Sequence, residues 1–453
     1  MRRSLLPAVM LVAGLATSTA ALDANYWTEK YGTRSLLLSG AVIGSVTDLS
    51  STFYNPGAYA LTDTSGFLLT VKALEFSSLE LEGEGGLASK LDDSRSGLLP
   101  SFLAGRLPFH ISTNSWLAYS VFTSVRQQAD ITGRTLLSRD VLPAQPGDET
   151  LAGEVRFEQD LDETWGGITW SARLGPRLGV GLSSYVVVRN QRFRRQVIAQ
   201  ALAADSVAAA TVDLAGFEYQ NGRLVWKAGV LFGAGPVNVG LTATTPGVNL
   251  WGSGSAGVDK MRIGQGAGRG DEFAVTSQED AGSRYESPPS LGGGVEIPLS
   301  RTTVYLSGEW FDAVEGFEVI DVDDFVAQGS GELVRVPIRQ TLRRVVNWAV
   351  GIDRQFSPRT TGYLSFGTDY SGNPDGQSDV SFSTWDAYLV TVGAAFRVLK
   401  ADFTLGVAYA FGSNEASSVA NFDGANVGNG LVGTPTATEI RYRSLRFIFG
   451  FEF

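Results

Sequence analysis

The sequence predicts an all-β fold, a transmembrane antiparallel β-barrel of about 14 strands with an N-terminal plug, or hatch, segment. Large apolar residues alternate with small or polar residues through most of the chain after residue 64, which is the period of a strand. The connections between these stretches alternate between short turns and long loops. Beyond the N-terminus, no apolar run reaches the roughly 18 residues that a spanning helix needs. A membrane protein of this kind must therefore be a closed barrel.

The composition excludes several function classes. The 453 residues include 54 glycines, no cysteine and one histidine, His110, and the net charge is -11. The lack of cysteine excludes disulfides, thiolate metal sites and a cysteine nucleophile. The acidic balance argues against nucleic acid as a partner. Barrel hydrolases use a histidine general base, and His110 falls at a predicted turn, so we expect no catalytic residue, metal or cofactor.

Residues 1–21 have the features of a secretory signal peptide. Arg2 and Arg3 form a basic start, an apolar core follows over residues 5–16, and small residues at 18–21 offer a cleavage site. We therefore expect a chain exported across a bacterial inner membrane.

Residues 22–63 precede the first regular strand and show no alternation. They contain Asn55-Pro56-Gly57, a turn signal in which proline presets φ and glycine permits unusual backbone angles. The segment is too apolar for a flexible tail. A lumen of fourteen strands is wide enough to need a plug or to conduct water, and this segment is the natural candidate for a plug.

Residues 64–453 are expected to form the barrel. Six short connections alternate with seven long ones, as expected for a barrel with short periplasmic turns and long extracellular loops. Both termini then lie on the periplasmic rim. The predicted strands cover residues 65–80, 98–109, 115–131, 153–174, 177–197, 213–233, 236–251, 285–298, 301–319, 340–356, 359–370, 384–398, 401–413 and 438–453. The glycine-rich stretch 252–284 is expected to be a mobile extracellular loop.

The alternation also assigns the two faces of the wall. In residues 340–356, Val346, Trp348 and Ile352 point one way, whereas Asn347 and Asp353 point the other. The apolar face is expected to meet lipid, because a charged residue at the bilayer midplane costs about 2–4 kcal/mol. Pro246-Gly247 falls within a predicted strand and predicts a kink there.

The final strand places its aromatic residues on one face, which suits a strand that meets lipid. This ending resembles the C-terminal strand of bacterial outer-membrane barrels, which the assembly machinery recognises. The expected assembly signal comprises Phe447, Phe449, Phe451 and Phe453. We expect a monomer that contacts outer-membrane lipid, lipopolysaccharide and the barrel-assembly machinery.

The stretch Ser51-Thr52-Phe53-Tyr54-Asn55-Pro56-Gly57-Ala58, followed by fourteen strands and a C-terminal Phe, resembles the FadL family of outer-membrane transporters of long-chain fatty acids and other hydrophobic compounds. Gly57 stands where this family usually has alanine. A related motif in PorV-like outer-membrane proteins of secretion systems is a weaker resemblance.

The FadL resemblance implies uptake of a hydrophobic ligand, which passes from the outer loops to a pocket above the hatch and leaves when the hatch shifts, often laterally through the wall. The candidate apolar lining residues are Leu36, Leu38, Val42, Ile43, Phe53 and Tyr54. For Leu36 to Ile43, the alternative role is packing of the plug against the wall. Arg189, Lys227 and Arg343 point inward and are candidates to pair with a carboxylate head group. The competing functions are a general diffusion porin and a structural or secretion-system component.

Overall fold

The computed structural model describes most of the chain after the expected signal peptide. The described residues are 24–45, 48–62, 66–83, 91–109, 111–139, 147–203, 206–264, 271–335, 338–374, 383–398, 401–416 and 438–452. The signal-peptide prediction, His110 and Phe453 lie outside these residues. No helix within them is long and apolar enough to cross a membrane.

Three short helices precede a long series of strands. The helices are α1 (Thr33–Leu37), α2 (Ser51–Tyr54) and α3 (Pro56–Tyr59). The first half of the strands comprises β1 (Phe67–Gly83), β2 (Leu91–Arg106), β3 (Ser115–Arg139), β4 (Glu149–Gly175), β5 (Leu178–Ala203), β6 (Ser206–Ala234), β7 (Val237–Thr244), β8 (Val248–Ile263), β9 (Glu272–Gly282) and β10 (Ser290–Leu299). The second half comprises β11 (Thr302–Phe311), β12 (Val314–Ile320), β13 (Phe325–Val326), β14 (Leu333–Val334), β15 (Ile338–Leu342), β16 (Val345–Ser357), β17 (Thr360–Asp369), β18 (Asp386–Val398), β19 (Ala401–Ala416) and β20 (Thr438–Glu452).

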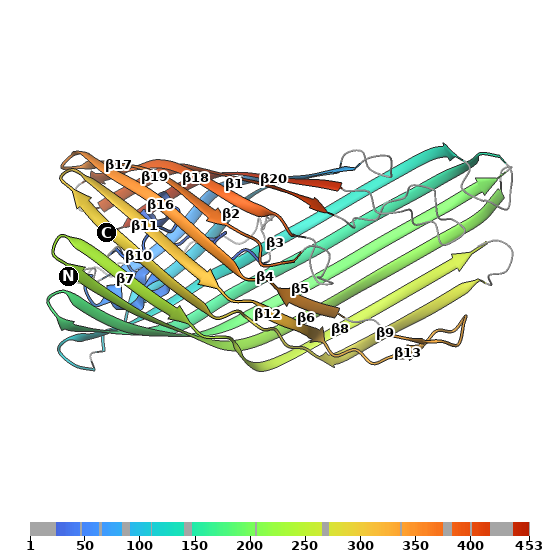
Figure 1. The fold of residues 1–453 in the computed structure, drawn as a ribbon, viewed down its shortest axis with the longest axis horizontal. Helices are drawn as coiled ribbons and strands as arrows, with labels where there is room; N and C mark the ends of the chain where they lie inside the picture. Colours follow the sequence, from blue (N-terminus) through green and yellow to red (C-terminus); the bar gives the residue numbers. More distant parts are fainter. Residues whose placement is uncertain are drawn as a thin grey trace, which may run out of the picture.

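Fourteen of these strands form a closed antiparallel ring (Figure 1). The ring runs β1 to β7 in order, continues through β10, β11 and β16 to β20, and returns to β1. It closes where Phe76 of β1 lies opposite Leu445 of β20. The prediction of about fourteen strands in a barrel is confirmed.

The longest strands exceed their predicted lengths. Strands β3 to β6 contain 25 to 29 residues each and extend well beyond the shorter strands of the ring (Figure 1). In the added part of β3, Arg134 pairs across the ladder with Glu154 of β4 at 3.0 Å. Opposite charges that face each other across a ladder stabilise strand pairing, so a polar stretch continues as strand where an apolar pattern ends.

The prediction of a mobile loop over residues 252–284 is wrong for the residues that the structure describes. Most of this stretch belongs to the hairpin of β8 and β9, which pairs with the outer half of β6. One of its glycines allows a close backbone contact. A Cβ on Gly252 would lie 2.0 Å from the carbonyl oxygen of Ser283, which directly follows β9.

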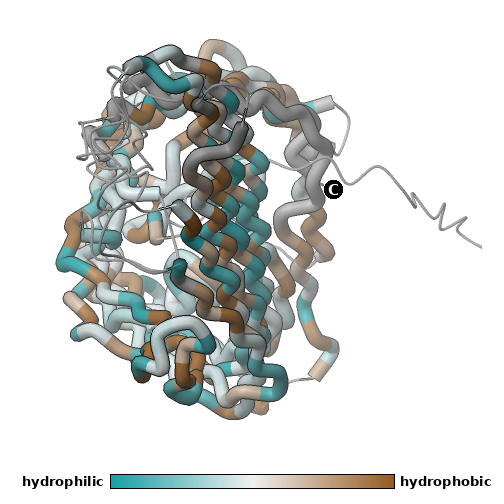
Figure 2. The backbone as a smooth tube through the Cα atoms, turned by 90° about the vertical axis from the view of Figure 1, so that its right-hand side faces the viewer, coloured by the Kyte–Doolittle hydropathy of each residue, from teal (hydrophilic) through white to brown (hydrophobic). Residues whose placement is uncertain are grey.

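The predicted faces of the wall agree with the exposure of its side chains. Val346 and Trp348 are 51% and 39% exposed, whereas Asn347 between them is fully buried. Figure 2 shows the same alternation of hydrophobic and hydrophilic residues along several strands. The apolar outer face is the kind that suits lipid, and the inner face packs on the N-terminal segment.

Candidate functional site

The residues before β1 lie against the inner face of the ring, and residues 24–62 are called the hatch segment below. Almost every described residue in it is buried. Its backbone accepts hydrogen bonds from Tyr185 of β5 at 2.7 Å, Ser365 of β17 at 2.9 Å and Arg446 of β20 at 2.9 Å. These strands lie far apart around the ring, so the hatch segment is anchored on several sides.

The Asn55-Pro56-Gly57 motif forms the start of α3. The side-chain oxygen of Asn55 accepts a hydrogen bond from the Gly57 amide at 3.0 Å, and Pro56 occupies the first turn, where its missing N–H costs nothing. The Asn55 amide group donates to the carbonyl oxygens of Ile43 at 2.8 Å and Val230 at 3.0 Å. One side chain therefore joins α3, the preceding hatch loop and strand β6.

Gly57 lies where the hatch backbone touches the wall. A Cβ added there would lie 2.7 Å from the carbonyl oxygens of both Gly179 and Gly229, inside the shortest ordinary contact of 3.4 Å. The contact needs glycine on both sides, because a Cβ on Gly179 would in turn lie 2.2 Å from the Gly57 oxygen. This approach accounts for glycine at a position where the FadL family usually has alanine.

The predicted apolar lining residues divide into two groups. Leu36, Leu38, Val42 and Ile43 are buried in the apolar core between the hatch and the wall. Leu38, for example, packs over Gly351, where a Cβ would meet its side chain at 2.7 Å. Tyr54 is also buried and accepts a hydrogen bond from the Tyr31 amide at 3.0 Å. Phe53 is half-buried and faces an open pocket.

This lumen pocket has a volume of about 90 Å³ and rests on hatch residues Asn25, Tyr26 and Phe53. Its lining combines apolar and aromatic side chains with charged and neutral polar ones. The aromatic and aliphatic members from the wall are Val125, Trp165, Val225, Tyr285, Pro288 and Phe311. The charged members are Glu163, Arg189, Arg223, Lys227 and Glu309, and the neutral polar members from the wall are Ser124, Thr244, Thr245, Ser287 and Ser290. A concavity with aromatic and apolar side chains and convergent polar groups is the kind of site that binds small molecules.

Two arginines of the pocket share one carboxylate. Glu163 accepts a hydrogen bond from Arg189 at 3.1 Å, one from Arg223 at 2.6 Å and one from the Trp165 indole at 2.8 Å. Both guanidinium groups also lie against the Tyr285 ring, at 4.1 and 4.8 Å from its centroid. Of these five residues, only Arg189 was predicted as a site residue, although Glu163 and Arg223 have inward parity.

The predicted cation Lys227 connects the pocket to the hatch. Its ammonium group lies 3.4 Å from Glu309 and 4.8 Å from the centre of the Phe53 ring. Glu309 in turn accepts a hydrogen bond from the Trp27 indole of the hatch at 2.9 Å. Arg343, the third predicted cation, lies away from this pocket. It pairs with Asp386 at 3.0 Å and donates to the Ser371 carbonyl at 2.8 Å.

The strand ladder is interrupted beside the pocket. Residues 245–247 separate β7 from β8, and residues 283–289 separate β9 from β10. The pairing of β7 with β10 ends at Thr244–Ser290, and the pairing of β8 with β9 begins only at Ser253–Gly282. Pro246 and Pro288 have no N–H to give to a ladder. Exposed Leu250 and Leu291 lie on the outside of the same region. The expected kink at Pro246-Gly247 is therefore present as a strand break.

A second interruption lies on the other side of the pocket. Strands β2 and β3 pair only from Phe102–Phe122 to Arg106–Ala118 in the described residues. Beyond this point β3 bulges at Thr123–Val125, and Val125 lines the pocket. The lumen pocket is thus bordered by weakened wall on two sides.

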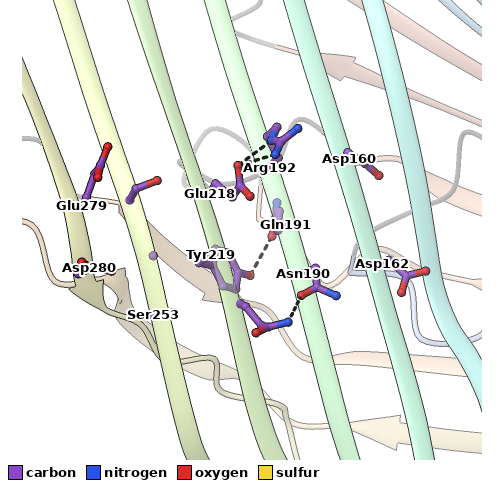
Figure 3. A pocket seen from close by; sticks show the side chains of 13 residues that line it. Asp160, Asp162, Asn190, Gln191, Arg192, Glu218, Tyr219, Ser253, Glu279 and Asp280 are labelled. Carbon is purple, nitrogen blue, oxygen red and sulfur yellow. Dashed lines mark hydrogen bonds and ion pairs between the residues drawn. The ribbon is translucent and has the colours of Figure 1, made fainter.

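A larger hollow of about 600 Å³ lies over strands β4, β5, β6, β8 and β9 (Figure 3). Its charged members, such as Asp160, Arg192 and Glu218, alternate along their strands with buried Gln191 and Tyr219. Arg192 pairs with Glu218 within the hollow, and Asp162 pairs with Arg126 outside it. This polar and charged surface is poorly suited to an apolar ligand.

Comparison with solved structures shows several with the same fold. A Pseudomonas aeruginosa FadL homologue matches with a TM-score of 0.62 and 12% identity, over 94% of this chain and 99% of that chain. The P. putida toluene transporter TodX matches with a TM-score of 0.58 and 13% identity, over 93% of this chain and 98% of that chain. The Ralstonia pickettii toluene transporter TbuX matches with a TM-score of 0.55 and 11% identity, over 94% of this chain and 99% of that chain. The expected resemblance to the FadL family is confirmed at the level of the fold. Neither a family model nor a curated protein matches the chain by sequence.

Proposed function

We propose that the protein lies in the outer membrane, with both termini in the periplasm, and imports small hydrophobic compounds through its lumen. The main support is the lumen pocket, a partly apolar concavity whose floor is the hatch segment. The fold is also that of proteins described as toluene transporters. The assembly signal at Phe447, Phe449, Phe451 and Phe453, the lipopolysaccharide contacts and the monomeric state remain proposals.

The pocket's size favours compact compounds. Its volume of about 90 Å³ is below the roughly 150 Å³ of an engineered cavity that takes up benzene. A ring or one end of an acyl chain fits such a space after small side-chain movements, whereas a whole long-chain fatty acid does not. We therefore place monocyclic compounds before long-chain fatty acids among the transported ligands.

We propose that the ligand leaves the pocket when the hatch segment shifts. Glu309 supports this coupling, because it bonds both to pocket-lining Lys227 and to Trp27 of the hatch. A ligand that displaces Lys227 weakens the same network that holds the hatch. The interrupted wall at residues 245–247 and 283–289 offers a second route, sideways into the lipid.

A reversible disulfide tests the hatch route. The hydroxyl oxygens of Ser39 in the hatch and Ser365 in β17 lie 2.8 Å apart, and the longer C–S bonds of two cysteines would bring their sulfurs nearer to the roughly 2.05 Å of a disulfide. The chain has no cysteine, so the double variant Ser39→Cys/Ser365→Cys has one pair to oxidise. We expect the oxidised variant to lose uptake of labelled toluene and labelled oleate by cells, and a reductant to restore it.

A matched pair within the wall controls for oxidation itself. Thr169 of β4 and Ser183 of β5 have hydroxyl oxygens 2.8 Å apart, so Thr169→Cys/Ser183→Cys joins two strands that are already paired. Its uptake should not depend on reductant. Uptake that persists in the oxidised hatch variant contradicts the hatch route, and wild-type uptake no greater than that of vector-only cells contradicts transport.

Deleting residues 24–62 separates a plugged transporter from a general diffusion porin. The transporter should gain ion conductance in planar bilayers, whereas an open porin should conduct equally with and without the segment. A protein that copurifies in fixed ratio, together with no ligand uptake, would favour the structural or secretion-system alternative.

A further inference from the structure

The lumen pocket contains an excess of positive charge. Three cations, Arg189, Arg223 and Lys227, line it against two carboxylates, Glu163 and Glu309. All five side chains are at least nine-tenths buried. A buried charge without a counter-charge is costly, so such a site favours an occupant that brings one negative charge.

The two arginines differ in how many of their guanidinium nitrogens donate hydrogen bonds. Arg189 donates to Glu163, Gln191 and the Tyr219 hydroxyl, which occupies all three of its nitrogens. Arg223 donates through Nε to Ser287 at 2.7 Å and through Nη2 to Glu163. Its Nη1 has no hydrogen-bond partner among the described residues. The unused donor therefore belongs to Arg223.

Arg223 also lies at the interrupted wall. Its partner Ser287 belongs to the segment between β9 and β10, and Gly247, between β7 and β8, lies over the arginine stem. A Cβ on Gly247 would meet the Arg223 Cδ at 2.7 Å. The guanidinium thus joins the two sides of the break at the edge of the pocket.

Aromatic rings surround the same charges. Tyr285 stacks beneath both guanidinium groups, and Trp165 donates to Glu163. Phe53 lies under Lys227. A flat ring can pack against these side chains, while an acidic group on that ring reaches the cations.

We propose that the lumen pocket selects compact aromatic acids, a single ring with one carboxylate, and that Arg223 is the residue that recognises the carboxylate. This inference rests on the proposed transport function and narrows its substrate class. The carboxylate supplies the missing negative charge and accepts from Nη1 of Arg223. A neutral ring of the same size fills the same space but leaves the extra charge uncompensated.

Calorimetric titration of the purified protein in a non-ionic detergent tests the proposal. Benzoate, benzyl alcohol and toluene serve as probes, because they share one ring and differ in charge and hydrogen bonding. We expect benzoate to bind wild-type protein at least 10-fold more tightly than either neutral probe. Equal binding of benzoate and benzyl alcohol would overturn the proposal.

Arg223→Gln removes the excess charge and leaves two cations against two carboxylates, so the fold should be retained. It should weaken benzoate binding at least 10-fold more than it weakens toluene binding, and Arg223→Lys should recover part of the benzoate affinity. Arg192→Gln is the matched control, since Arg192 pairs with Glu218 on the exposed face. Unchanged benzoate affinity in Arg223→Gln would reject the role of this arginine. If wild-type cells take up toluene but the pocket does not bind benzoate, only this inference fails.

Discussion

Replacing Gly57 by alanine tests whether the hatch is held by backbone contact with the wall. The new Cβ would lie 2.7 Å from two carbonyl oxygens, those of Gly179 and Gly229, which are fixed in the strand ladder. Helix α3 must therefore move by about 0.7 Å to reach the shortest ordinary contact of 3.4 Å. That movement strains the bonds from Asn55 to Val230 and from Ser171 to Pro56, at 3.0 and 2.8 Å.

Two effects of opposite sign decide the outcome. Alanine is favoured over glycine within a helix by about 0.5–1 kcal/mol. Overpacking of a tight contact costs about 1–3 kcal/mol, and here neither oxygen can yield without breaking the ladder. We expect a net loss of roughly 1–2 kcal/mol in the docking of the hatch. Such a loss raises the population of displaced hatch about 5- to 30-fold.

Hydrogen exchange of the hatch amides measures this population directly. In Gly57→Ala, the protection of residues 52–60 should fall by the same factor, while protection of β4 and β5 should be unchanged. Gly166→Ala is the matched control, since its nearest neighbour would be a Val121 methyl at an ordinary 3.9 Å. Unchanged hatch protection in Gly57→Ala would refute the close-contact argument.

Three further predictions concern the hatch motif, the wall and the β12–β15 pair. Asn55→Ala removes the cap of α3 and two bonds to carbonyl oxygens, so we expect a loss of about 1–3 kcal/mol in hatch docking, measured by the same exchange experiment. Val186→Lys places a charge on the exposed apolar face of β5 and should lower the free energy of unfolding in lipid vesicles by about 1–4 kcal/mol, depending on depth; no loss would contradict the lipid-facing assignment. In the β12–β15 pair, a hydrogen bond from Arg339 holds the pKa of Glu318 below its usual value, so its contribution to the β12–β15 pairing is present above the usual glutamate range and is lost as the pH falls through the lowered value. Exchange at β12 should rise with acidification in wild type and show a weaker pH dependence in Glu318→Gln.

Sequence periodicity was sufficient to predict most of the strands in the ring, because their apolar residues repeat every second position. The predicted strands 301–319 and 340–356 contain β11 and β16 of the ring, but each prediction also ran across a break into β12 or β15, which pair in a separate sheet. The outer halves of β3 to β6 lack this signal. There Arg134, beyond the predicted end of its strand, pairs with Glu154 of the neighbouring strand, and such pairing depends on register, which a single sequence does not reveal.

The candidate site was predictable only in part, for the same reason. Inward parity identified Arg189 and Lys227, and the hatch motif identified Phe53. The alternation of residues along a strand determines which face of the wall a residue occupies, but not its position along the barrel axis or its neighbours on other strands. Arg343 was therefore grouped with Arg189 and Lys227, from which it is separated in the structure. Glu163 and Glu309 were not predicted as site residues, because a carboxylate becomes part of a site only through partners on other strands.

Barrel closure has a consequence for how the chain must be made. The joining contact between Glu75 and Ser444 spans 369 positions along the chain. Strand β1 therefore remains an unpaired edge until synthesis is almost complete, and until then the sheet has two open edges that can pair with other chains. Contacts so distant in sequence form slowly. A nascent chain of this protein must be kept from aggregating for nearly its whole period of synthesis, and a truncation within β20 should be far more harmful than one of equal length in an outer loop.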